Sequence, residues 1–324
     1  MEKIKIEEAA ARLLKMDQAL ILCHRNPDGD TMGCGYGLCR ALRLMGKQAR
    51  VACHDPIPGS LAYMADGLEE QAFQEKCIIS VDVADAGLLG DSLAHYAGLV
   101  DLAIDHHESH RPFAKALCLD GGAAAACEIV YEILLSMGAP ITKEVADCLY
   151  TGIATDTGCF KYTNVTPHTH RAAAALIEAG CDFGRINKVQ FDTKSLALLQ
   201  LEQKVLAGLE MYEYNRIAVI TVTREMLLQS GLRESELYDL AGVPRQIEGV
   251  DAGVTIKERG DNDYKISLRT SEALDASAVC ARFGGGGHKR AGGCSFSGPL
   301  TALKPALLQA LREALPQREG SGEN

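Results

Sequence analysis

One short segment of the chain combines an imidazole and two carboxylates within seven residues, His24-Arg25-Asn26-Pro27-Asp28-Gly29-Asp30. Carboxylate oxygens supplemented by imidazole nitrogens are the ligands that hard divalent cations such as Mn²⁺ and Mg²⁺ favour. In an extended turn, the two aspartates of Asp-Gly-Asp direct their carboxylates the same way. The segment is therefore a candidate metal site. The alternative is a surface turn whose Asp side chains bond only to nearby backbone amides.

Two further segments place polar side chains directly after apolar runs. Asp82 ends the run CIISVD, where a single Asp more commonly caps the helix that follows. The next apolar run ends in Asp105-His106-His107. Buried carboxylates and imidazoles need polar partners, so packing alone does not explain three of them in succession. We predict that His106 is a metal ligand or a catalytic group. The segment from His107 to His110 lacks the His-Glu-x-x-His spacing of zinc proteases.

A last acid, Asp156, ends a predicted helix whose neighbouring residues TGIATDTG are small. A carboxylate at a helix C-terminus opposes the helix dipole and calls for a compensating cation. The candidate ligands are then His24, Asp28, Asp30, Asp82, His106 and Asp156. Four of them are acidic, which suits two divalent ions that share one bridging carboxylate. Two such ions about 3.5–4 Å apart can activate a water and polarise a phosphoryl oxygen, which indicates phosphoester hydrolysis. No cysteine belongs to the set, so a structural zinc site is disfavoured.

The elements that must position these residues follow an alternating pattern in the first half of the chain. Apolar runs predict strands, and 3.6-residue periodicity predicts helices that end near Gly46, Gly138 and Gly180. The predicted strands are 18–24, 48–54, 77–82 and 98–105, and the predicted helices are 33–45, 124–137, 142–154 and 167–179. This alternation is typical of an α/β domain with a mostly parallel sheet. Ligands bind such sheets at the carboxyl ends of the strands, where the candidate residues collect.

The pattern changes in the second half. We expect residues 188–214 to form a connecting helix, and a smaller α+β domain to begin near residue 215. Its predicted strands are RIAVITVT, VDAGVTIKE and YKISLRT, and its predicted helices lie near 233–241, 274–283 and 301–314. The polar tail PQREGSGEN is predicted to fray.

Length and composition fit this plan. A chain of 324 residues suggests about two domains. The formal net charge of -10 disfavours a protein that coats long nucleic acid, but leaves room for a local basic groove. No apolar run reaches the ~18–20 residues of a membrane span, and the N-terminus MEKIKIEEAA is charged. We therefore expect a soluble cytoplasmic protein with no membrane or long-duplex partner.

Twelve cysteines in apolar runs, without a Cys-x-x-Cys pair, predict buried thiols rather than disulfides or a zinc knuckle.

A glycine-rich segment, Phe283-Gly284-Gly285-Gly286-Gly287-His288-Lys289-Arg290-Ala291-Gly292-Gly293, is a second candidate site. Four consecutive glycines lose much backbone entropy on folding, and their amides could together bind one phosphate. The alternative is a tight or flexible loop. His288, Lys289 and Arg290 follow directly and favour phosphate contact. No Gly-Lys-Ser/Thr follows, which excludes a Walker A loop.

The motifs HRNPDGD, SVDVAD, IDHH and TGIATDTG resemble, in this order, the four motifs of the DHH phosphoesterase superfamily, and FGGGGHKRAGG resembles the signature of the DHH-associated domain. Within the superfamily the chain is most similar to the bacterial nanoRNase group of bifunctional oligoribonucleases and pAp phosphatases. The resemblance implies a DHH catalytic domain over 1–187, the connecting helix over 188–214 and a DHH-associated substrate-binding domain over 215–324.

The resemblance also implies roles for single residues. One Mn²⁺ would be held by His24, Asp28 and Asp82, and the other by Asp30, Asp82, His106 and Asp156. Mg²⁺ or Co²⁺ are alternatives to Mn²⁺. His107 is implied to contact the scissile phosphate or assist the leaving group, and Asp105 to orient the adjacent histidines. The substrate would be bound by Arg269, Gly285, Gly286, Gly287, His288, Lys289 and Arg290. Thr31-Met32-Gly33-Cys34-Gly35 departs from the small Ala or Ser that usually follows the first motif.

The implied reaction is attack of a metal-bridging hydroxide on phosphorus, with the second domain gripping the substrate across a cleft. It would release 5′-mononucleotides from short RNA or dinucleotides such as pApA, or inorganic phosphate from 3′-phosphoadenosine 5′-phosphate (pAp). Three alternatives stay open at this point: a pyrophosphatase or polyphosphatase, a cyclic-dinucleotide phosphodiesterase, and a catalytically silent nucleotide sensor. The sequence does not decide whether the chain forms a homodimer.

Overall fold

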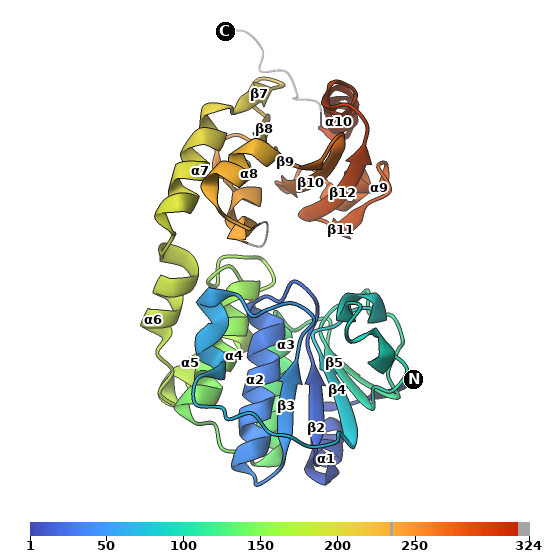
Figure 1. The fold of residues 1–324 in the computed structure, drawn as a ribbon, viewed down its shortest axis with the longest axis vertical. Coiled ribbons are helices and arrows are strands. Elements are labelled where there is room, and N and C mark those ends of the chain that lie inside the picture. The colour runs from blue at the N-terminus through green and yellow to red at the C-terminus, as the bar shows by residue number, and fades with distance from the viewer. Residues whose placement is uncertain (234–235, 317–324) are drawn as a thin grey trace. The chain divides into compact units, whose positions relative to one another are not determined.

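The computed structural model describes residues 1–233 and 236–316 of the chain. The chain divides into two compact units, Met1–Thr193 and Lys194–Asn324. Each unit has its own six-stranded sheet (Figure 1).

The sheet of the first unit is parallel throughout its paired strands, in the order β1-β6-β5-β4-β2-β3. Its strands are β1 (Glu2–Ile4), β2 (Ala19–Leu22), β3 (Ala49–Ala52), β4 (Cys77–Val81), β5 (Leu102–Asp105) and β6 (Ala116–Leu119). The predicted α/β class and parallel sheet are confirmed. The edge strand β1, with only three residues, and its neighbour β6 are additional to the predicted strands.

Side chains alternate between the two faces of this sheet, because successive residues of a strand point to opposite sides. Ile21, Ile79 and Ile104 belong to the larger core under the α-helices. Leu20 and Ile78 belong to a smaller core on the other face, under the 3₁₀ helices Ala86–Leu89 and Ala94–Tyr96. Both faces are therefore covered, as parallel sheets require.

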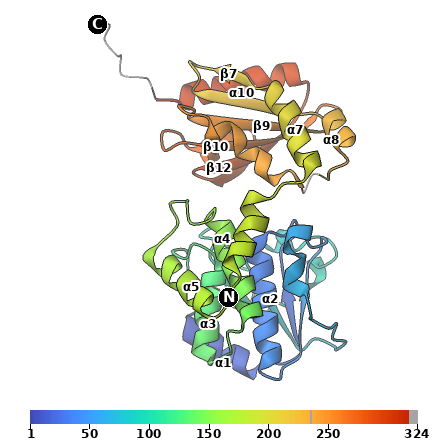
Figure 2. The same cartoon turned by 90° about the vertical axis from the view of Figure 1, so that its left-hand side faces the viewer.

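The helices of the first unit are α1 (Ile6–Lys15), α2 (Gly29–Leu44), α3 (Ala126–Met137), α4 (Lys143–Asp156), α5 (Pro167–Glu178) and α6 (Phe183–Asn187). Short 3₁₀ helices occupy Gly59–Ala65, Ala86–Leu89 and Ala94–Tyr96. Figures 1 and 2 show α2, α3 and α4 packed beside one another. Helix α2 begins four residues before the predicted start, because the Asp28 side chain caps it by accepting from the amides of Asp30 and Thr31. Helix α1 was absent from the sequence prediction.

The predicted connecting helix over 188–214 is wrong as a single helix. Helix α6 continues into a π-helical turn (Lys188–Asp192), and the separate helix α7 (Leu196–Ala207) starts at the Ser195 cap. The stretch then ends in strand β7 (Glu210–Tyr212). The Ser195 hydroxyl accepts a hydrogen bond from the Leu198 amide, which fixes the new start.

The second unit has a mixed sheet in the order β11-β12-β10-β9-β8-β7. Its remaining strands are β8 (Ile217–Val222), β9 (Ala252–Gly260), β10 (Asp263–Thr270), β11 (Gly286–His288) and β12 (Ala291–Ser297). Only the β8–β9 pair is parallel among the pairs of this sheet within the described residues. The predicted α+β character is confirmed.

Helices cover both faces of this second sheet. One core lies under α9 (Ala276–Ala281) and α10 (Leu300–Ala314), and the other under α7 and α8 (Arg224–Ser230). The predicted helix near 233–241 includes residues outside the described part of the chain, and 3₁₀ turns occupy Tyr238–Ala241 and Val243–Gln246. The tail from residue 317, predicted to fray, also lies outside the described residues. Across the described ranges, no helix has the length and apolar character needed to cross a membrane.

Candidate metal centre

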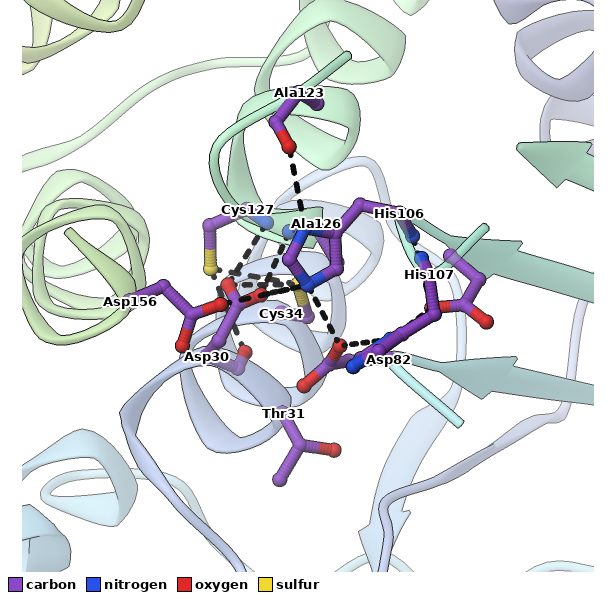
Figure 3. A network of polar contacts seen from close by, with 12 residues as sticks. Asp30, Thr31, Cys34, Asp82, His106, His107, Ala123, Ala126, Cys127 and Asp156 are labelled. Carbon is purple, nitrogen blue, oxygen red and sulfur yellow. Dashed lines mark hydrogen bonds and ion pairs between the residues drawn. The ribbon is translucent and has the colours of Figure 1, made fainter. Parts of the chain in front are cut away.

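The carboxyl ends of three adjacent strands carry the predicted ligands. His24 follows β2, Asp82 follows β4, and His106 follows β5, and these strands are neighbours in the order β5-β4-β2. Asp28 and Asp30 stand at the start of α2, and Asp156 ends α4. All six predicted ligands therefore converge at one edge of the sheet, as the strand-end argument predicted (Figure 3 shows four of them).

Asp82 joins two sets of ligand atoms. Its Oδ2 lies 3.6 Å from His24 Nε2, which is itself 3.5 Å from Asp28 Oδ1. Its Oδ1 lies 3.5 Å from His106 Nε2. His24, Asp28 and Asp82 form one group whose donor atoms all lie within 4.8 Å of one another. The two oxygens of Asp82 therefore face two different groups.

The second group contains Asp30, His106 and Asp156, with donor atoms again within 4.8 Å of one another. His106 Nε2 lies 3.4 Å from Asp156 Oδ2 and 3.9 Å from Asp30 Oδ2. Asp82 is not a member of this second group but forms a further group with His106 and His107, so His106 links the second group to Asp82. The two ligand sets that the sequence resemblance implied therefore stay predictions, with their side chains close together in the structure.

Both histidines present the same ring nitrogen to the acids. His24 Nδ1 lies 2.8 Å from the carbonyl oxygen of Arg25, and His106 Nδ1 lies 3.2 Å from that of Ala123. A carbonyl only accepts, so each Nδ1 carries the proton and donates it. Each Nε2 therefore points at the carboxylates, and it is the ring nitrogen that would bind a metal once its proton is displaced.

Asp30 is held by the start of helix α3. The amide of Ala126 donates to Oδ2 at 2.6 Å, and the amide of Cys127 donates to Oδ1 at 2.9 Å. Helix N-termini favour anionic groups, so the start of α3 is a favourable place for this side chain. The residue is completely buried. Its two oxygens are thereby oriented before any ion binds.

The close approach of α4 to this carboxylate depends on one glycine. A Cβ at Gly152 would lie 2.7 Å from Asp30 Oδ1 and 2.3 Å from Cys127 Sγ. Both distances are shorter than real Cβ contacts. The prediction that small residues before Asp156 allow a close approach is therefore confirmed at Gly152.

Burial and mutual repulsion make the ionised carboxylates of this cluster unfavourable in the metal-free protein. Burial raises the pKa of Asp82 to about 7, and repulsion by Asp30 adds to this. Burial and repulsion by Asp30, Asp28 and Asp82 raise the pKa of Asp156 well above its ordinary value. Burial lowers the pKa of His24, but its contacts with Asp28 and Asp82 raise it to about 11. Positive charge in the cluster would relieve this repulsion.

Two buried atoms in the middle of the cluster lack a hydrogen-bond partner among the described residues, Asp82 Oδ1 and His106 Nε2. Unpartnered buried polar atoms are rare and call for an explanation. Both are metal-ligating atom types, and both face the space between Asp30, Asp82 and Asp156. The donor set of carboxylates and imidazoles thus fits two hard divalent cations.

Two cysteines stand closer to the cluster than the sequence suggested. Cys34 Sγ lies 3.8 Å from Asp30 Oδ1 and 3.4 Å from Cys127 Sγ. No cysteine was among the candidate ligands predicted from the sequence. Cys34 and Cys127 form a group with Asp30 whose donor atoms lie within 4.8 Å of one another, but neither shares a group with Asp82. Ten of the twelve cysteines are buried, as predicted, and Cys53 and Cys159 are half-buried.

Asp105 and His107 lie next to the cluster. Asp105 is buried, and its Oδ1 accepts hydrogen bonds from the His107 amide at 3.2 Å and from His107 Nδ1 at 2.8 Å. His107 Nδ1 also lies 3.5 Å from Asp82 Oδ1, and 27% of its side chain is exposed. A reachable imidazole with its Nδ1 fixed can present Nε2 to a substrate. The orienting role of Asp105 stays a prediction.

The glycine-rich segment of the second unit is part of a β-hairpin. β11 pairs antiparallel with β12, and Lys289 and Arg290 form the turn between them. The amides of Gly284 and Gly285 donate to helix α9 carbonyls, so the predicted exposure of these two amides to an anion is wrong. The amides of Gly286 and Gly287 remain predicted contacts.

Close packing explains two of these glycines. A Cβ at Gly285 would lie 2.2 Å from the carbonyl oxygen of Gly293. At Gly287, where φ is +135°, it would lie 2.4 Å from the carbonyl oxygen of Ala291. Close packing in a tight loop therefore explains the glycines at 285 and 287, and no ligand is needed to explain them.

The strand register brings two predicted anion contacts into one row. Arg269 of β10 pairs with Ala291 of β12, which pairs with His288 of β11. Directly paired residues point to the same face, so Arg269 and His288 share a face at one end of the sheet. The Arg290 guanidinium is already used in part, because it donates to the carbonyls of Ser271 at 2.6 Å and Leu274 at 3.4 Å.

Sequence reasoning missed His110, whose Nδ1 lies 2.5 Å from Asp105 Oδ2. The only signal in the sequence was the spacing of three residues between His107 and His110. That spacing was compared only with the motif of zinc proteases. Cys34 and Cys127 were missed because they are 93 residues apart and meet only through the packing of α2 on α3.

Comparisons with known proteins cover both units. The family model described as "DHH family, N-terminal domain" matches residues 18–153, and the model described as "DHHA1 domain" matches residues 215–317. The first match includes five of the six predicted ligands and ends three residues before Asp156.

Curated relatives span nearly the whole chain. A protein of Thermus thermophilus named "Bifunctional oligoribonuclease and PAP phosphatase NrnA" is 29% identical over 91% of this chain and 89% of its own length. The protein of the same name from Bacillus subtilis is 26% identical over 86% of this chain and 90% of its own length.

Solved structures share the fold. An exopolyphosphatase-related protein from Bacteroides fragilis superimposes with a TM-score of 0.85 at 24% identity, covering 95% of each chain. A structure of the exonuclease RecJ bound to manganese gives a TM-score of 0.54 at 14% identity, covering 99% of this chain and 98% of that one.

Proposed function

The chain is a phosphoesterase of the DHH family with a C-terminal DHHA1 domain, and on this premise we propose that it hydrolyses short oligoribonucleotides with two Mn²⁺ ions. The products would be 5′-mononucleotides from short RNA and from linear dinucleotides such as pApA. The same centre would convert pAp to AMP. The names of the relatives from Thermus thermophilus and Bacillus subtilis, which match over most of their length, support this substrate class.

The observation that carries the proposal is the placement of Asp82. Its two oxygens face two groups of ligands, at 3.6 Å from His24 Nε2 and 3.5 Å from His106 Nε2. A single structural ion would need only one such group. A shared carboxylate supports a pair of cations acting on one phosphate.

When bound, two divalent cations supply Lewis acidity to a phosphoryl oxygen and lower the pKa of water. His24, Asp28 and Asp82 would hold one ion, and Asp30, Asp82, His106 and Asp156 the other. Mn²⁺ is proposed over Mg²⁺ because the set mixes imidazole with carboxylate, whereas Mg²⁺ prefers oxygen ligands and retains water. Mg²⁺ and Co²⁺ remain alternatives in the test.

His107 is proposed to act on the substrate directly. Asp105 fixes its Nδ1, which leaves Nε2 to exchange a proton with the leaving oxygen or to donate to a phosphate oxygen. Burial lowers the pKa of His107, but the hydrogen bond with Asp105 and the charge of Asp82 raise it above its ordinary value. A raised pKa favours a proton donor at neutral pH.

The second unit is proposed to bind the substrate through Arg269, Gly286, Gly287, His288, Lys289 and Arg290. A short substrate has few phosphates, so a small cationic patch suffices despite the net charge of -10. The cytoplasmic location and the exclusion of long duplexes stay predictions.

The test is product analysis of the purified protein with Mn²⁺. pApA, a short 5′-labelled RNA, pAp and inorganic pyrophosphate are offered in parallel, with a chelator control and Asp82→Asn as an inactive control. We expect mononucleotides from the RNA substrates and AMP from pAp, all stopped by the chelator. Consumption of pyrophosphate alone would replace the proposal with a pyrophosphatase. Tight nucleotide binding without turnover would replace it with a sensor.

A further inference from the structure

We propose that His110 is a positioning residue, which fixes Asp105 and through it holds His107 toward the substrate. The inference rests on the proposed function, because it adds a residue to the same site. It concerns a third histidine that lies beyond the Asp105-His106-His107 triplet.

The hydrogen bonds of Asp105 divide unequally between its two oxygens. Oδ1 accepts from the amides of His106 and His107, at 2.8 and 3.2 Å, and from His107 Nδ1 at 2.8 Å. Oδ2 accepts a hydrogen bond from His110 Nδ1 at 2.5 Å, its partner among the described residues. The orientation of the carboxylate about its own axis therefore depends on His110.

His110 is well placed for this task. Its side chain has no exposed surface, and its ring stacks on Phe113 with the centroids 5.4 Å apart. Its amide donates to the carbonyl of His107 at 3.0 Å, which closes a tight turn over the triplet. The imidazole cannot leave Asp105 without breaking this packing.

The second ring nitrogen of His110 shows that Nδ1 is the polar atom that the residue uses. Nε2 is buried and has no hydrogen-bond partner within the described part of the chain. An unpartnered buried polar atom is unfavourable by about 1–3 kcal/mol. An apolar side chain of similar size would not bury an unpartnered nitrogen, but it could not donate to Asp105. The hydrogen bond from Nδ1 to Asp105 is therefore what the histidine provides at this position.

The chain of contacts His110–Asp105–His107 fixes both imidazoles in one tautomer. An ionised carboxylate has no proton to give, so each Nδ1 must donate to it. Asp105 Oδ1 lies 2.8 Å from His107 Nδ1, and Oδ2 lies 2.5 Å from His110 Nδ1. His107 Nε2 is then the atom that faces the substrate.

The experiment compares three substitutions of His110. Asn places its side-chain nitrogen at the position of Nδ1, Gln places it near that of Nε2, and Phe keeps the ring but removes the donor. His95→Asn, an exposed histidine of the same unit, is the matched control. For each variant we measure kcat and KM for pApA with saturating Mn²⁺, the bound Mn²⁺ and the melting temperature.

We expect His110→Gln and His110→Phe to lower kcat by about 10- to 100-fold, as for other residues that orient an active-site side chain through a hydrogen bond. KM and bound Mn²⁺ should change little, because His110 contacts neither ligand group. His110→Asn should restore kcat to within about threefold of the wild type, because it keeps a donor at the Nδ1 position. Equal loss in the Asn and Gln variants, or a normal kcat in Gln, would overturn the proposal.

A second readout separates this inference from the proposed function. In the metal-free protein, protons in short hydrogen bonds to a carboxylate give downfield NMR signals. We expect two such imidazole signals, from His107 and His110, and in His110→Gln the His107 signal should shift or broaden. An unchanged His107 signal would refute the coupling. This result stands even if the wild-type protein hydrolyses none of the nucleotides, in which case only the proposed function fails.

Discussion

Asp82 combines a left-handed backbone with a buried carboxylate. Its φ is +56°, a region that residues other than Gly and Asn seldom adopt, and only 3% of the residue is exposed. Both features are unfavourable in the metal-free protein. Together they direct one oxygen to each ligand group, so the strain serves the placement of the shared carboxylate.

Asp82→Asn is expected to abolish metal-dependent turnover. Loss of an orienting residue behind a ligand lowers metal affinity or activity by about 10- to 100-fold, so loss of the bridging ligand should exceed about 100-fold. Turnover of pApA and bound Mn²⁺ per chain are measured. Asp85→Asn, three residues further on and paired with Arg111, is the control and should retain both. Near-normal activity of Asp82→Asn would contradict the bridging assignment.

The pH dependence of Mn²⁺ binding follows from the same carboxylate. Burial raises the pKa of Asp82 to about 7, so below that pH the metal-free protein holds a proton that Mn²⁺ must displace. Affinity should therefore fall by about tenfold for each pH unit below 7 for one displaced proton. Isothermal titration with Mn²⁺ between pH 5 and 8 measures this. A flat affinity over that range would contradict the raised pKa.

The stability of the metal-free protein should show the opposite trend. A raised carboxyl pKa means that the folded chain binds more protons than the unfolded chain between the ordinary Asp value and about 7. Stability should then fall as pH rises through this window. Denaturant titrations of chelator-treated protein measure the slope, and Asp82→Asn should flatten it. An unchanged slope in that variant would assign the effect to other groups.

Single residues were predictable where their types limited the chemistry. The acids and histidines after the apolar runs indicated a metal centre before any geometry was known. His110 was not predictable, because its partner atom, Asp105 Oδ2, is chosen by the turn and not by the spacing. The same holds for Cys127, which meets Asp30 only through the packing of α3 on α2.

At the level of elements, the packing of α2 against α4 controls the cluster. Gly152→Ala is expected to displace Asp30, because the added Cβ would lie 2.7 Å from its Oδ1 and 3.0 Å from its Cα. Overpacking of this kind destabilises by roughly 1–3 kcal/mol. Stability and bound Mn²⁺ should both fall. They are measured by denaturant titration and by metal analysis.

Gly184→Ala supplies the matched control for this helix substitution. Gly184 lies within α6, and an added Cβ there meets nothing within 4 Å. Ala at an open helical position usually stabilises by about 0.4–1 kcal/mol. Equal effects of the two substitutions would show that Gly152 has no special relation to Asp30.

Elements with strong apolar runs were predictable, and those fixed by neighbours were not. The buried strands β2, β4 and β5 fall within their predicted ranges, although β5 begins four residues later than predicted. The strand β11 could not be read from Gly286–His288, because glycines have low strand preference and only the pairing with β12 makes them a strand. The interruption before α7 depends on one cap, Ser195, within a sequence whose periodicity continues.

In the whole molecule, the two kinds of candidate residue fall in different units. All six predicted metal ligands lie in Met1–Thr193, and all seven predicted substrate contacts lie in Lys194–Asn324. Metal content and substrate affinity should therefore respond to different substitutions. The two-domain plan was predictable from the change of pattern near residue 215, whereas the hairpin that carries His288 was not.

This separation gives a last prediction. Arg269→Ala and His288→Ala should each raise KM for pApA by roughly 10- to 100-fold. This factor corresponds to the loss of about 1.5–3 kcal/mol, the contribution of a hydrogen bond to a charged group. Bound Mn²⁺ should stay at the wild-type level in both. Lys265→Ala is the control, because Lys265 lies on the same face of β10 four residues from Arg269, toward the other end of the strand.

The double variant shows whether the two side chains act on one group. Arg269 and His288 stand in one row across β10, β12 and β11, so both can contact the same phosphate. Residues that share a partner give non-additive effects, and the double variant should then lose less than the product of the single losses. Fully multiplicative losses would place the two contacts on different phosphates. A loss of Mn²⁺ in either single variant would contradict the division between the units, because neither residue belongs to the unit that holds the ligands.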